Sequence, residues 1–223
     1  MEDVLTDIPP PSRFFEEDLN IFTPPSAPLP TPLLLLSEAY ANETLRPSLL
    51  IFALSAPSLH VFHHASSKTL IGSLILPEIS DSGNTISPSL KDKSCNIYAL
   101  NDTESLVLVV SVQLHVPPER CHAVSKLLLG DKIVPERVLI LDSIQIQKFR
   151  NKLSRDDTVA YKLETSSERK GSGHCPGGLL RELEYYPSGS LVDGLAAALF
   201  ARCQIRNIKG LDIPTYNFHT KTQ

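Results

Sequence analysis

The sequence predicts an α/β fold: a mixed β-sheet with flanking helices in Rossmann-like layers, preceded by a proline-rich amino-terminal segment. Apolar runs typical of buried strands recur between residues 48 and 142, and a helix pattern separates the last two of them. A longer helix pattern follows at 188–206. Strand, helix and strand at this spacing imply a right-handed crossover between parallel strands. We therefore expect one α/β domain at 48–210, between an amino-terminal segment at 1–47 and a tail at 211–223.

The amino-terminal segment at 1–47 differs in composition from the rest of the chain. It holds nine of the 18 prolines, and eight acidic residues against two basic ones. Proline removes an amide donor and like charges repel, so the segment is predicted to be largely extended or disordered. Inside it, Phe15, Leu19 and Phe22 would share one face if Ser12 capped a short helix. We interpret that stripe either as a contact with the chain's own domain or as a partner-binding motif.

Five strands are predicted in the first half of the domain from their apolar runs and β-branched residues. The first three are expected to form a meander, and the last two to pair across a turn at Asn101-Asp102. Residues 77–93 are rich in Ser, Pro, Asp and Gly and are predicted to be a loop. The predicted strands are 48–54, 58–64, 69–76, 95–100 and 105–116.

The second half of the domain alternates helix and strand. Pro117 and Pro118 are expected to begin a helix that ends near Leu129, before a strand at 137–142. Residues 166–178 are predicted to be a flexible insertion.

The helix predicted at 188–206 is too apolar to face water. Ser188 or Ser190 is expected to cap its start, and Arg202 and Arg206 lie in its last turn, where the helix dipole favours cations. Residues 194–201 carry no charge on any face, which indicates packing on more than one side.

Five stretches spread over the chain before Gly210 carry a family resemblance. They are Met1–Phe15, Arg46–Ile51, Asp92–Leu100, Pro135–Asp142 and Tyr185–Lys209. These stretches are similar to the plant form of proteasome assembly chaperone 1. The resemblance implies a noncatalytic chaperone that pairs with proteasome assembly chaperone 2 and holds 20S proteasome α-subunits while their ring assembles. It implies no cofactor.

The alternative interpretation is a small cytosolic α/β enzyme, a hydrolase or a nucleoside-processing enzyme, with Asp142 and a histidine as acid and base. Asp142 ends an apolar strand, which is where α/β folds place ligand-binding residues. Ser143 follows it, however, and an aspartate at such a position more often caps the next segment. The polar residues of the chain are scattered, whereas its many apolar residues need packing partners. The chaperone interpretation is therefore favoured, and no catalytic residue is predicted.

The histidines and cysteines predict no metal site. On a strand at 58–64, His60 and His64 would face one side and His63 the other, so the three could not share an ion. The four cysteines have neither zinc-ligand spacing nor the pattern of a disulfide framework.

Charge and hydropathy limit the partners. A net charge of −4 and a sequence pI near 6.0 leave no basic footprint for nucleic acid. The amino terminus lacks the basic and apolar regions of a signal peptide, and no stretch approaches the roughly 20 apolar residues that span a bilayer. We expect neither nucleic acid nor a membrane as partner, and a location in the cytoplasm or nucleus.

The tail after Gly210 departs from the family. Family members are similar in ending with a hydrophobic-Tyr-X motif that enters pockets between α-subunits, whereas here Tyr216 is not penultimate. Pro214 is expected to prevent a central strand in the tail, because proline has no amide donor for the ladder. Without that strand, the helix that contains Leu195, Leu199 and Phe200 would keep an exposed apolar face, and we expect low stability or solubility for the chain alone.

Overall fold

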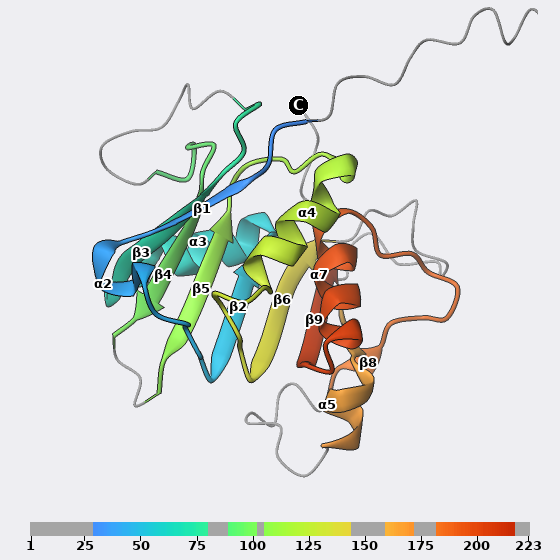
Figure 1. Ribbon diagram of the computed structural model, residues 1–223. Coiled ribbons are helices and arrows are strands. Elements are labelled where there is room, and N and C mark those ends of the chain that lie inside the picture. The colour runs from blue at the N-terminus through green and yellow to red at the C-terminus, as the bar shows by residue number, and fades with distance from the viewer. Residues whose placement is uncertain (1–28, 80–88, 102–104, 144–158, 172–181, 217–223) are drawn as a thin grey trace, which may run out of the picture.

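The structure is a computed structural model that describes residues 29–79, 89–101, 105–143, 159–171 and 182–216 (Figure 1). The strands are β1 Leu33–Leu36, β2 Leu49–Ala53, β3 Lys68–Ile75, β4 Cys95–Leu100, β5 Val107–Val112, β6 Arg137–Ser143, β7 Val159–Glu164, β8 Glu184–Tyr185 and β9 Lys209–Tyr216. The helices are α2 Glu38–Ala41, α3 Ala56–His64, α4 Pro118–Leu128, α5 Ser166–Lys170 and α7 Gly194–Ile205.

The described strands form one mixed sheet in the order β1-β3-β4-β5-β2-β6-β9-β7-β8. Its centre is parallel, because β5 and β6 flank β2 and β9 pairs with β6 in the same direction. On one side β4, β3 and β1 follow as antiparallel neighbours. On the other side β7 is antiparallel to β9, and β8 is parallel to β7. The predicted α/β fold with a mixed sheet and flanking helices is confirmed.

The two faces of the sheet are covered differently. Helices α4 and α7 lie side by side on one face, and α3 lies on the other (Figure 1). The main core is beneath α4 and α7, where Phe52, Val124, Ile140 and Leu199 have no exposed surface. Close packing of apolar side chains from two helices and the sheet makes this layer the main source of stability.

Most of the predicted elements match the structure within a few residues. The predicted helix after Pro117 is α4, and β5 is shorter than the strand predicted at 105–116. Helix α5 begins the stretch predicted as a flexible insertion, and the rest of that stretch after Gly171 is outside the described residues. Strands β2, β3, β4 and β6 correspond to the runs predicted at 48–54, 69–76, 95–100 and 137–142.

Helix α3 replaces the strand predicted at 58–64, so that prediction is wrong. Ser55 is the N-cap, and its side chain accepts a hydrogen bond of 3.4 Å from the backbone N–H of Ser58. Pro57 lies in the first turn, where its missing N–H is harmless. The predicted meander is wrong as well, because β4 and β5 separate β3 from β2 in the sheet.

Helix α7 begins later than predicted. Its N-cap is Asp193 and not Ser188 or Ser190. The predicted packing on more than one side is confirmed, because α7 contacts α4 as well as β6 and β9. Leu195 and Leu199 are buried and Phe200 is half-buried, so the exposed face expected from these three residues is wrong for the two leucines.

Strand β9 runs through Pro214, which contradicts the prediction that proline would prevent a central strand. It lies between β6 and β7. Its pairing with β7 joins Thr215 to Ala160 and Asp212 to Leu163, and the ladder is open opposite Pro214. The missing amide of the proline therefore falls where β7 makes no ladder contact, a position at which proline is tolerated.

Candidate interaction surface

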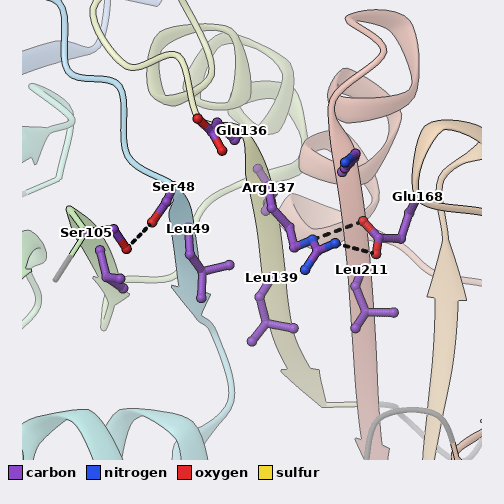
Figure 2. A pocket seen from close by; sticks show the side chains of 11 residues that line it. Ser48, Leu49, Ser105, Glu136, Arg137, Leu139, Glu168 and Leu211 are labelled. Atoms are coloured by element: carbon purple, nitrogen blue, oxygen red, sulfur yellow. Dashed lines mark hydrogen bonds and ion pairs between the residues drawn. The ribbon is translucent and has the colours of Figure 1, made fainter. Parts of the chain in front are cut away.

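A hollow of about 450 Å³ lies on the sheet face opposite α4 and α7, where the parallel strands begin (Figure 2). Its floor is apolar and comes from four neighbouring strands. Leu49 of β2 and Leu139 of β6 are half-buried, and Val107 of β5 and Leu211 of β9 complete the floor. The alternation of side chains along each strand brings these residues to one face. Helix α3 covers a neighbouring part of this face, where Phe62 packs on the sheet.

The rim of the hollow carries polar groups that pair with one another. Two hydrogen-bonding contacts join the Arg137 guanidinium to the Glu168 carboxylate, at 3.1 and 3.2 Å (Figure 2). The Ser48 hydroxyl donates to the Ser105 hydroxyl at 2.8 Å. Lys209 adds a further positive charge, and the rim also includes the exposed Glu136 as a negative one. The charges are balanced, so the rim does not select a strongly charged ligand.

Thr165 holds the Glu168 side of the rim in place. It is the N-cap of α5 and accepts a hydrogen bond from the backbone N–H of Glu168. The same hydroxyl accepts from the Gly210 N–H at 2.9 Å and donates to the Ile208 carbonyl at 3.0 Å. A Cβ at Gly210 would lie 2.9 Å from the Thr165 methyl and 3.1 Å from the Cys203 Cβ. Only glycine therefore allows β9, α5 and α7 to meet this closely.

The position of the hollow is unusual for a catalytic site. Ligands of doubly wound α/β folds bind outside the carboxyl ends of the strands. The hollow lies at the opposite ends, and the Ser48 hydroxyl at its rim donates to the Ser105 hydroxyl. An apolar floor inside a polar, charge-balanced rim is compatible with a protein–protein contact.

The carboxyl ends of β6 and β9 carry Asp142 and Asp212. Asp212 is fully buried, and within the described part of the chain neither of its carboxylate oxygens has a hydrogen-bond partner. Burial, and to a lesser extent the charge of Asp142, raises the pKa of Asp212 to about 8. Asp212 is therefore protonated at neutral pH, because a neutral carboxyl group is easier to bury than a charged one.

The structure does not bring Asp142 together with the histidines of α3. Asp142 shares a face with Ile140, under α4 and α7, whereas His60, His63 and His64 belong to α3 on the other face. The acid–base pair of the enzyme hypothesis does not form with these histidines. Among the described residues, no group of three or more His, Cys, Asp or Glu side chains is arranged to hold a metal ion.

The remaining predicted site residues, Phe15, Leu19 and Phe22, are outside the described residues. Their role as a partner-binding motif stays a prediction. None of the described helices has the length and hydropathy needed to cross a membrane.

The sequence matches no protein-family model and no curated protein. The fold is similar to several solved structures. PbaA of Pyrococcus furiosus, described as an archaeal homologue of proteasome-assembly chaperone, superposes with a TM-score of 0.59 at 13% identity, over 86% of this chain and 74% of its own. PbaB of the same organism, described as an archaeal proteasome activator, superposes with a TM-score of 0.54 at 11% identity, over 85% of this chain and 82% of its own. A Thermoplasma acidophilum protein of unknown function superposes with a TM-score of 0.50 at 17% identity, over 80% of this chain and 69% of its own. At these identities the likeness shows a shared fold.

Proposed function

We propose that this chain is a noncatalytic chaperone for 20S proteasome assembly, which acts as a heterodimer with proteasome assembly chaperone 2 and holds α-subunits while their ring forms. The observation that carries the proposal is the apolar hollow, in a fold that this chain shares with PbaA. The five family-like stretches of the sequence support the same role. The proposal places the protein in the cytoplasm or nucleus.

The chemistry of the hollow supports protein binding over catalysis. Leu49 and Leu139 present half-buried apolar surface, and a partner that covered them would remove that surface from water. The ion pair of Arg137 with Glu168 lies at the rim, where polar groups surround the apolar centre of most protein interfaces. The hollow also lies away from the carboxyl ends of the parallel strands, where α/β folds place their catalytic ligand sites.

The proposal is tested by affinity purification of the full chain from its native cell, with identification of the proteins that co-purify. We expect proteasome α-subunits and the second chaperone in the purified fraction. A purified fraction that contains neither α-subunits nor the second chaperone would contradict the proposal. Addition of the purified second chaperone to the purified chain, followed by size-exclusion chromatography, distinguishes a direct pair from an indirect association.

A further inference from the structure

Helix α3 places two histidines one turn apart on the same face. His60 and His64 are four residues apart, and a helix of about 3.6 residues per turn brings such positions side by side. Their ring centroids are 6.3 Å apart, and the ring planes differ by 28°. Both side chains are exposed, so an ion from solvent has access to them. The strand predicted at 58–64 also put these two histidines on one side, and it excluded only a site shared by all three histidines.

The backbone that carries the two histidines is fixed at both ends of the helix. At the start, the Ser58 hydroxyl donates to the Ser55 carbonyl at 2.8 Å. At the end, the Lys68 ammonium donates to the carbonyls of Phe62 and His63. Phe62 itself packs against the sheet. The two exposed imidazoles therefore project from a rigid support, which reduces the entropy lost when both bind one ion.

The third histidine of the helix faces a different environment. His63 is half-buried in a small pocket together with Lys68 and Tyr98. Burial and the neighbouring Lys68 charge lower the pKa of His63. The Lys68 ammonium lies 5.2 Å from the centre of the Tyr98 ring, on the sheet side of the helix. The His63 ring also lies edge-on to His64, with the centroids 5.2 Å apart, but His63 is half-buried, so the exposed pair consists of His60 and His64.

We propose that His60 and His64 form a two-histidine site for a divalent transition-metal ion, with water in the remaining coordination positions. Imidazole nitrogen suits Zn²⁺, Ni²⁺ and Cu²⁺. Mg²⁺ and Ca²⁺ prefer oxygen ligands, so the pair does not select them. The site needs only two side chains from this chain, which agrees with the lack of any larger ligand group among the described residues.

The test is calorimetric titration of the untagged full chain with NiCl₂ at about pH 7.5. We compare it with His60→Gln, His64→Gln and the double variant, and we use His115→Gln with His122→Gln as the matched control of exposed histidines elsewhere. The wild-type chain should bind one more ion than the double variant. Each single variant should lose at least about tenfold in affinity, because two ligands on one rigid element act together. The control should bind as the wild type does.

One further readout separates this site from histidines outside the described residues. With Cu²⁺, electron paramagnetic resonance should report two nitrogen ligands that the double variant loses. Equal stoichiometry and equal spectra for the wild type and the double variant would overturn the proposal, as would an absence of binding by the wild type. Melting curves without metal verify that the variants are folded.

Discussion

The two faces of the sheet differ in how completely they are covered. Under α4 and α7, Phe52, Val124 and Leu199 are fully buried. On the opposite face, Leu49 and Leu139 line a hollow of about 450 Å³ and stay half-buried. Both faces present apolar residues, but only the first has its own helices to cover them at this position. The difference suggests that the first face maintains the fold and that the second takes part in binding.

A large effect is predicted for a fully buried side chain on the covered face. Leu199→Ala should lower the free energy of unfolding by about 2–5 kcal/mol, because it removes fully buried atoms and leaves a cavity between α7 and the sheet. Urea denaturation measures this change. Ile205→Ala is the control on the same helix, since Ile205 is 72% exposed and should change stability by less than about 0.5 kcal/mol. Equal losses of unfolding free energy in the two variants would contradict the difference between the buried and the exposed side of this helix.

The second prediction concerns the pH dependence caused by Asp212. Its pKa is raised from 3.8 to about 8, so between these pH values the folded chain holds a proton that the unfolded chain has released. Stability should therefore fall as pH rises from about 4 to about 8, by on the order of 5 kcal/mol. Asp212→Asn has no carboxyl group to titrate, so the dependence of the free energy of unfolding on pH should become flatter. Asp131→Asn, at an exposed site, is the control. A profile that Asp212→Asn leaves unchanged would contradict the assignment.

A smaller effect is expected at the rim of the hollow. Arg137→Gln removes the two hydrogen-bonding contacts of the guanidinium with the Glu168 carboxylate, whose side chain is only 5% exposed. We expect a loss of about 1–3 kcal/mol in the free energy of unfolding. Arg137→Gln combined with Glu168→Gln should recover part of the loss, because the charge of the buried carboxylate is then removed as well. A double-mutant cycle by urea denaturation gives the coupling energy between Arg137 and Glu168. Strictly additive losses in the free energy of unfolding would contradict the predicted coupling.

The smallest effect is expected for Asp142→Asn. Asp142 is half-buried at the end of β6, and we expect a loss below about 1 kcal/mol with unchanged partner capture. Thermal melting and co-purification are the two measurements. An assembly defect in a variant that melts normally would contradict a purely structural role for Asp142.

Sequence patterns predicted the α/β class and most strands, because their apolar runs are long enough to distinguish them from loops. Residues 58–64 were assigned incorrectly because a short apolar run fits a strand or a helix. The local signal that identifies the helix, Ser55 followed by Pro57, lies just before the run. At Pro214 the rule against proline in central strands failed for a reason outside the local sequence, namely the gap in the β7 ladder.

The hollow itself could not be predicted from the sequence. Leu49, Leu139 and Leu211 are ordinary strand residues in their local sequences, and only the order of the strands brings them together. Asp212 did carry a signal, since an acidic residue between Leu211 and Ile213 interrupts an apolar run. Because no strand was expected around Pro214, this signal at Asp212 was not recognised as a buried acidic residue.

The most direct test of the account is the affinity of the purified chain for the second chaperone, measured by calorimetry for the wild type, Leu139→Asp and Ile205→Asp. Leu139 lies in the floor of the hollow, and Ile205 is an exposed apolar residue on the helix of the other face. Leu139→Ala is included, and thermal melting of each variant separates loss of binding from loss of folding.

We predict that Leu139→Asp weakens binding by about 100-fold or more while the variant remains folded, because a charge is then buried in the apolar centre of the contact. Leu139→Ala should weaken binding less, and Ile205→Asp should bind as the wild type does. Wild-type affinity in a folded Leu139→Asp variant would contradict the assignment of the open face as the surface that binds the partner.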